Sequence, residues 1–199
     1  RPEELHLGIG SESIADTSKI LSTYGNAFML RTDSDKKLDQ FKKYSSIPII
    51  NGLSPSSHPT QVLSDIFTIQ EIKKKSISKL KLCWIGDANN NMINSLIEAC
   101  LKFSVSLNIA CPKGYQPNKN LTFLIKKQKG KIKIFNKKEK AVKNSDVVMT
   151  DKIISLNDNV NKKKKLKSFK NFKVDKKTMN LAKKDAIFLH CLPRGNEVT

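Results

Sequence analysis

The feature that most constrains this fold is a regular alternation of short apolar runs with amphipathic segments, from about residue 81 to residue 191. The runs have the length of strands, and the segments between them have helical apolar spacing. Such alternation favours parallel strands, because each helix returns the chain to the same end of the sheet. We therefore predict a doubly wound α/β domain with strands at 81–87, 105–111, 131–135, 146–151 and 186–191, and helices at 92–103, 121–128, 137–144 and most of 162–174.

The earlier part of the chain predicts a second, smaller α/β unit. A helix capped by Ser11 and ended by Gly25 is expected there, with strands at 27–30 and 47–53. A long helix begins at Pro59, because proline is favoured in the first turn of a helix. The expected fold is two Rossmann-like parallel-sheet units, the first truncated. The expected domains are a partial unit over 1–58, an interdomain helix over 59–75 and a unit over 76–199 whose C-terminal end is missing.

The net charge of +19 raises the question of a nucleic-acid partner. Only three of the 37 basic residues are arginine, the residue on which nucleic-acid interfaces depend for bidentate contacts. We therefore expect the lysines to form solvated faces and expect no nucleic-acid partner. No apolar run approaches the roughly 20 residues that cross a bilayer, and no leader segment is seen. A cytoplasmic protein with no membrane partner is expected.

The cysteines and glycines argue against metals and common cofactors. The four cysteines form no CxxC pair and have no regular ligand spacing with the histidines, so no metal site is expected. Cys83, Cys100 and Cys111 are expected to be small buried hydrophobes. The segment GDANNNMIN after the strand at 81–87 has one glycine rather than GxGxxG, and no GxxxxGK[ST] occurs. No cofactor is expected.

Polar residues lie at the ends of several predicted strands or just after them. Ligands bind outside the carboxyl ends of parallel strands, so these residues are candidates for one cleft between the two units. Simpler interpretations exist, because Asp87 and the asparagines after it can cap a helix, and a histidine before proline is often a turn residue. The candidates are Arg31, His58, Asp87, Asn89, Asn90, Asn91, Asp151, Ser155, His190 and Cys191.

Seven stretches together make the chain resemble the ornithine carbamoyltransferase family over essentially its whole length. HPTQ is typical of carbamoyltransferases broadly, whereas HCLP with TDxxxS favours the ornithine branch. The resemblance implies transfer of the carbamoyl group of carbamoyl phosphate to the δ-amine of L-ornithine, giving L-citrulline and phosphate in arginine metabolism, without metal or cofactor. The stretches are ESIADT (12–17), MLRT (29–32), SIPIINGLSPSSHPTQVLSD (46–65), WIGDANNNMINSL (84–96), CPKGYQP (111–117), DVVMTDKIIS (146–155) and FLHCLPR (188–194).

The same resemblance implies roles for particular residues and a homotrimer. Arg31 and His58 can donate to the carbonyl oxygen, and Gln61 can accept from the carbamoyl nitrogen. Asp151 can pair with the substrate ammonium, and Cys191 is the proton acceptor that the family implies. The implied catalytic residues are Cys191, Asp151, His58 and Arg31. The implied carbamoyl phosphate contacts are Arg31, His58, Pro59, Thr60, Gln61, Cys191 and Leu192, and the implied ornithine contacts are Asn91, Asp151, Ser155, Leu156 and Cys191.

Some features depart from the family. The usual SMG loop reads Ser155, Leu156, Asn157, which leaves open another amine substrate such as putrescine or N-acetylornithine. The family's phosphate-binding loop would precede Arg1, and an arginine-bearing segment would follow Thr199. We therefore expect a fragment that is inactive alone, from an active parent enzyme. A non-catalytic basic domain that binds nucleic acid is the alternative of another class.

Overall fold

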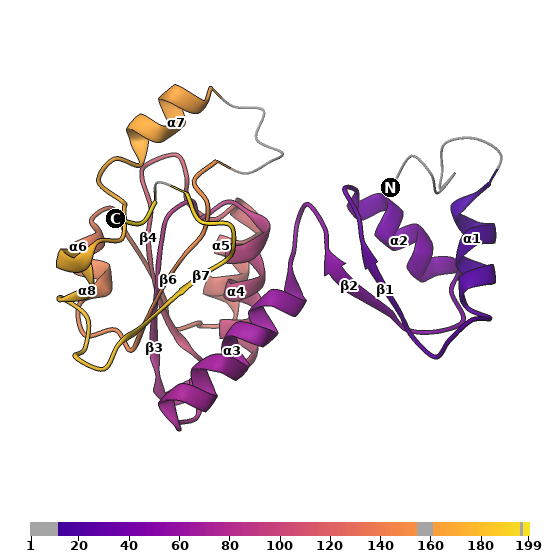
Figure 1. The fold of residues 1–199 in the computed structure, drawn as a ribbon, viewed down its shortest axis with the longest axis horizontal. Helices are drawn as coiled ribbons and strands as arrows, with labels where there is room; N and C mark the ends of the chain where they lie inside the picture. The colour runs from indigo at the N-terminus through magenta and orange to yellow at the C-terminus, as the bar shows by residue number, and fades with distance from the viewer. Residues whose placement is uncertain (1–11, 155–160, 196) are drawn as a thin grey trace. The chain divides into compact units, whose positions relative to one another are not determined.

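The computed structural model describes residues 12–154, 161–195 and 197–199, and the chain divides into two compact units at residues 60 and 61 (Figure 1). Every strand pairing among the described residues is parallel. The predicted α/β class with parallel sheets is thereby confirmed. None of the described helices is long and apolar enough to cross a membrane.

The first unit is a two-stranded parallel sheet with two helices. The Phe41 ring is buried and lies 6.2 Å from the Phe28 ring, measured between centroids, which packs the second helix on the sheet. The Ser18 hydroxyl donates to the Phe41 carbonyl at 2.9 Å and joins the helices to each other. The elements are α1 (Ile14–Leu21), β1 (Phe28–Arg31), α2 (Asp35–Tyr44) and β2 (Ile49–Leu53).

The predicted ends of α1 are wrong. Its N-cap is Ser13 rather than Ser11, because the Ser13 hydroxyl accepts from the Asp16 backbone N–H at 3.1 Å. Its last residue is Leu21, well before Gly25. Hydroxyl groups replace the expected glycine, since the next two side chains turn back and donate to helix carbonyls at 2.7 Å. These are Ser22 to Ser18 and Thr23 to Ile20.

The second unit has a five-stranded sheet in the order β5-β4-β3-β6-β7. Four of these strands, β3, β4, β6 and β7, are labelled in Figure 1. The chain moves outward from β3 through β4 to β5 and then returns to the other side of β3, so the strand order reverses between β3 and β6. Such a reversal is where open α/β sheets bind ligands. The strands are β3 (Lys81–Ile85), β4 (Ser106–Ala110), β5 (Ile132–Phe135), β6 (Val147–Thr150) and β7 (Ile187–His190).

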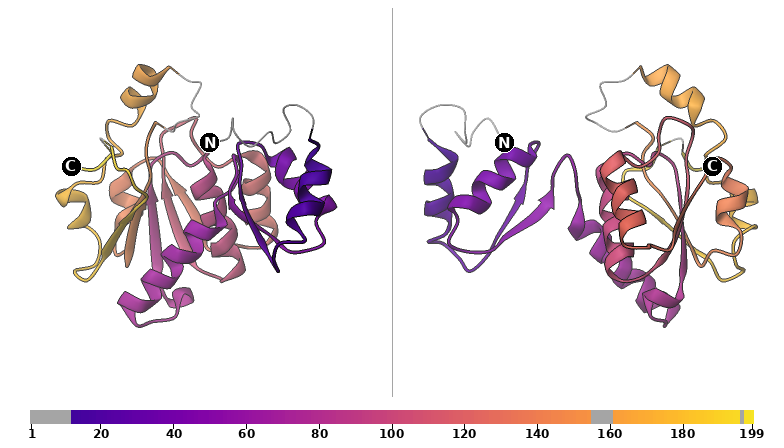
Figure 2. Two further views of the ribbon diagram at one scale, coloured as in Figure 1. Left: turned by 45° about the vertical axis from the view of Figure 1, so that its right-hand side comes forward. Right: turned by 180° about the vertical axis from the view of Figure 1, so that it is seen from behind.

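Alternating strand residues form a hydrophobic core on each face of this sheet. Helices lie over both faces (Figure 2). Leu82 and Trp84 of β3 face one core, and Cys83 and Ile85 face the other. The first core is covered by α3 (Pro59–Lys73), α4 (Asn91–Lys102) and α5 (Lys119–Lys127). The second is covered by α6 (Lys138–Val142), α8 (Lys176–Met179) and Phe169, which caps α7 (Lys162–Ser168). A short 3-10 helix, η2 (Ile77–Lys79), precedes β3.

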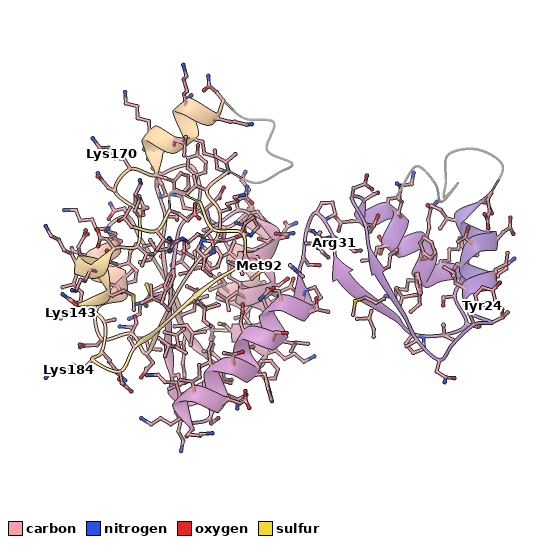
Figure 3. The ribbon with its side chains drawn as sticks, viewed as in Figure 1. Tyr24, Arg31, Met92, Lys143, Lys170 and Lys184 are labelled. Carbon is pink, nitrogen blue, oxygen red and sulfur yellow. The ribbon has the colours of Figure 1, made fainter. Side chains whose placement is uncertain are left out.

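Two further expectations need adjustment. Helix α3 ends at Lys73 rather than residue 75, because Lys74 adopts a left-handed conformation with φ of 50°. The lysine-rich segment is helical only over α7. Exposed lysines such as Lys143 and Lys184 do point away from the second unit, as predicted (Figure 3). Lys165 is an exception, because it is buried.

Candidate active site

The ends of β6 and β7 bring together two of the predicted catalytic residues. Thr150 pairs with His190 as the last residue of each strand. Asp151 and Cys191 follow immediately, and both are partly buried. Because the strands are parallel, the carboxylate and the thiol emerge at the same edge of the sheet, beside the reversal between β3 and β6. The Asp151 carboxylate also accepts from the Lys152 backbone N–H at 2.7 Å.

The acidic groups at this edge hold their protons more tightly than usual. Burial raises the pKa of Asp151 above 3.8, and the Glu197 charge adds to the rise. Burial, then the charges of Asp151 and Asp65, raise the pKa of the Cys191 thiol to about 12. Burial also raises the pKa of Asp65, and the Asp151 charge contributes. The arrangement disfavours three negative charges together, so it suits a cationic ligand.

The raised pKa bears on the role expected of Cys191. A thiol whose pKa is about 12 is neutral near pH 7, and a neutral thiol has no proton-accepting charge. Burial likewise raises the pKa of the three other cysteines to about 12 and leaves them inert, as expected of buried hydrophobes. Within the described residues no group of three or more His, Cys, Asp or Glu side chains is placed to hold a metal ion.

His190 contributes to the loop after β7. Its imidazole Nε2 lies 2.9 Å from Glu197 Oε1, and the two side chains are only 6% and 3% exposed. The Gly195 backbone N–H donates to the same Glu197 oxygen. The pair therefore holds the ends of the loop that carries Cys191, and His190 is committed to this structural role.

In the first unit, Arg31 and His58 stand at the carboxyl edge of the two-stranded sheet. Arg31 is the last residue of β1 and is exposed (Figure 3). His58 directly precedes Pro59, the first residue of α3, as predicted. Burial lowers the pKa of His58, and the Arg31 charge lowers it further, so the imidazole is neutral near pH 7. A neutral imidazole still carries one N–H that can donate to a carbonyl oxygen.

Two more predicted contacts lie in the first turn of α3. Thr60 Oγ1 lies 3.2 Å from the Gly52 carbonyl oxygen and 3.3 Å from His58 Nδ1, so its hydroxyl links the imidazole to β2. Gln61 Nε2 donates to Asp65 Oδ1 at 3.0 Å. Asp65 has no role in the sequence interpretation. Its four-residue spacing from Gln61 is the one signal that indicates a shared helix face.

The loop between β3 and α4 answers the question about helix capping. Asn90 is the N-cap of α4, since its side chain accepts from the Ile93 backbone N–H at 3.0 Å. Asp87 instead forms an ion pair with Lys165 at 2.7 Å and accepts from the Asn89 backbone N–H at 2.9 Å. The capping interpretation therefore holds for Asn90. Asn91 becomes the first residue of α4.

Three other predicted substrate contacts are not tested by the structure. Ser155 and Leu156 lie outside the described residues. The Leu192 side chain is 87% exposed, so a substrate contact through its backbone stays a prediction. Sequence reasoning missed three partners: Asp65, Lys165 and Glu197. No spacing signal indicates Glu197.

Comparison with known proteins places both units in one family. The description "Aspartate/ornithine carbamoyltransferase, Asp/Orn binding domain" matches residues 78–199. The companion description, "carbamoyl-P binding domain", matches residues 2–71. The two matches together span nearly the whole chain, and the first alone spans more than half of it.

Individual relatives agree with these domain matches. The chain is 44% identical to the ornithine carbamoyltransferase of Caldicellulosiruptor saccharolyticus. The alignment covers 98% of this chain and 65% of that protein. The solved anabolic ornithine carbamoyltransferase of Campylobacter jejuni has a TM-score of 0.91 at 38% identity, over 99% of this chain and 66% of that one. The Pyrococcus furiosus enzyme has a TM-score of 0.88 at 38% identity, over 99% and 64%. The chain thus spans about 65% of the length of the first relative.

Proposed function

The chain belongs to the aspartate/ornithine carbamoyltransferase family, and from this premise we propose that its protein is an ornithine carbamoyltransferase. The proposed reaction transfers the carbamoyl group of carbamoyl phosphate to the δ-amine of L-ornithine and releases L-citrulline and phosphate. The observation that carries the proposal is the position of Asp151 and Cys191 directly after the paired strand ends Thr150 and His190, where the Asp65 charge also acts on Cys191. A partly buried cluster of acidic groups is suited to an ammonium group.

In the proposed mechanism, the first unit polarises the electrophile. The Arg31 guanidinium and the neutral His58 imidazole donate to the carbamoyl oxygen, where negative charge develops as the amine attacks. The amine nitrogen forms the new bond to the carbamoyl carbon, and the bond from that carbon to the phosphate oxygen breaks. The excess positive charge of the protein favours the approach of the anionic donor.

The second unit handles the proton in this mechanism. The δ-ammonium of ornithine must lose a proton before its nitrogen can attack. Asp151 is the better acceptor, because its raised pKa makes the carboxylate a stronger base than an ordinary one, while the Cys191 thiol stays protonated. We assign the proton to Asp151 and give the Cys191 thiol the role of a neutral contact beside it. Asn91, Ser155 and Leu156 stay proposed ornithine contacts.

The decisive experiment is a citrulline assay on the protein from the complete open reading frame that contains this sequence. Ornithine, putrescine and N-acetylornithine should be compared as acceptors, because the 155–157 loop departs from the usual SMG sequence. Citrulline formation with a strong preference for ornithine is expected. Preference for another amine would identify a different carbamoyltransferase, and salt-dependent DNA binding without transfer would overturn the enzymatic proposal.

We also propose that the protein acts as a cytoplasmic homotrimer in arginine biosynthesis, which the family resemblance implies. Four unpaired cysteines fit a reducing compartment. Light scattering after size-exclusion chromatography measures the oligomeric state directly, and a stable monomer that is fully active would contradict the trimer.

A further inference from the structure

The hydrogen bond between Gln61 and Asp65 fixes the orientation of the Gln61 side-chain amide. Gln61 Nε2 lies 3.0 Å from Asp65 Oδ1, across one turn of α3. An ionised carboxylate only accepts hydrogen bonds, so the NH₂ group must be the end that faces Asp65. The carbonyl oxygen of Gln61 then faces the opposite direction as an acceptor. A rotation of the amide by 180° would place two acceptors against each other.

Asp65 also lies within electrostatic reach of the two groups at the strand ends. The Asp151 charge raises the pKa of Asp65, and the Asp65 charge raises the pKa of the Cys191 thiol. A single residue of α3 therefore bonds to the amide one turn before it, raises the pKa of the Cys191 thiol and is itself affected by the Asp151 charge. Asp65 is partly buried, so water screens these interactions incompletely.

We propose that Asp65 is a positioning residue for carbamoyl phosphate, which holds the Gln61 amide with its carbonyl oxygen turned toward the carbamoyl nitrogen. This inference rests on the proposed function. The carbamoyl NH₂ is a donor only, so a glutamine amide in the reverse orientation would oppose it with a second donor. Asp65 thereby selects the orientation that binds the substrate before the substrate arrives.

The test uses two substitutions of Asp65 in the protein from the complete open reading frame. In Asp65→Asn, the new amide can pair with Gln61 in either orientation, so about half the molecules are competent and the KM for carbamoyl phosphate rises about twofold. In Asp65→Leu, no partner remains, so the Gln61 side chain loses its fixed rotamer as well as its amide orientation and the KM rises about tenfold. In both variants kcat changes little, because the contact exists equally in substrate and transition state.

The controls separate positioning from a general structural effect. Glu71→Gln removes the same charge from an exposed position of the same helix and should leave the KM unchanged. Gln61→Ala should raise the KM, and adding Asp65→Leu to it should cause no further rise, because Asp65 acts through Gln61. The inference is overturned if the two effects multiply, if Glu71→Gln matches Asp65→Leu, or if neither Asp65 variant changes the KM. A wild-type protein that forms no citrulline would instead refute the proposed function.

Discussion

Replacing Lys165 with methionine is expected to lower the free energy of unfolding of the second unit by about 3 kcal/mol. Lys165 Nζ lies 2.7 Å from Asp87 Oδ2, and the side chains are only 5% and 8% exposed. Methionine keeps most of the aliphatic stem, so the packing changes little, whereas the Asp87 carboxylate loses its cation. Removing one partner of a buried ion pair costs roughly 3–5 kcal/mol. The lower end applies because Asp87 still accepts from the Asn89 backbone N–H at 2.9 Å.

Urea unfolding followed by Trp84 fluorescence measures this change. Trp84 is the only tryptophan, it is buried, and its Nε1 donates to the Asp87 carbonyl at 3.0 Å, so its emission reports on the unit that contains the ion pair. Lys164→Met is the matched control, because Lys164 is exposed on the same helix. Its effect should stay within about 0.5 kcal/mol.

A double substitution tests the cause. Asp87→Asn combined with Lys165→Met removes the uncompensated charge and keeps an oxygen for the Asn89 N–H, so most of the lost stability should return. If Lys165→Met costs less than about 1 kcal/mol, the ion pair behaves as a solvent-exposed one and the argument from burial fails. A double variant no more stable than the single one would show that the loss comes from packing.

Three further predictions concern titrating groups. Alkylation of Cys191 by iodoacetamide should rise about tenfold per pH unit to beyond pH 10, because its pKa is about 12; a plateau near pH 9 would contradict this. Asp151→Asn should raise the thermal midpoint at pH 7 but not below pH 3.8. Folding raises the pKa of Asp151, so the ionised carboxylate destabilises the folded state as the pH rises, and asparagine removes that charge. Equal midpoints for the variant and the wild type at pH 7 would refute this prediction. The His58 imidazole should titrate below 6.5 by NMR, since burial and Arg31 lower its pKa, and Arg31→Ala should move the titration upward; no movement would exclude the Arg31 charge as a cause.

The alternation of apolar runs with amphipathic segments predicts the parallel sheet. It also predicts that Asp151 and Cys191 lie at the same edge of that sheet. Each residue is the last of a predicted strand, and parallel pairing brings strand ends to one edge. The order of the strands is not in the pattern, because the periodicity of a strand says which face is buried and not which strand lies beside it. The adjacency of β6 and β7 therefore had to come from the structure.

Local sequence reasoning fails where a tertiary partner decides the outcome. The lysine run at 162–167 reads as a solvated face, yet Lys165 is the one buried residue of α7. Its position four residues before the buried Phe169 places both on the same face of the helix, and both contact Tyr115. The spacing was visible in the sequence, but the partner Asp87 comes from a strand end 78 positions earlier.

The net charge of the molecule and the local charge at the strand ends favour ligands of opposite sign. The net charge of +19 attracts anions from a distance, whereas the edge formed by Asp65, Asp151 and Cys191 disfavours added negative charge. The charges of His190 and, to a smaller extent, Lys152 lower the pKa of Asp151, but burial outweighs them and the pKa stays raised. These cations therefore offset the acidic character of the edge only in part. A bound ammonium would add further positive charge, and the protein should therefore become more stable as a cationic substrate binds.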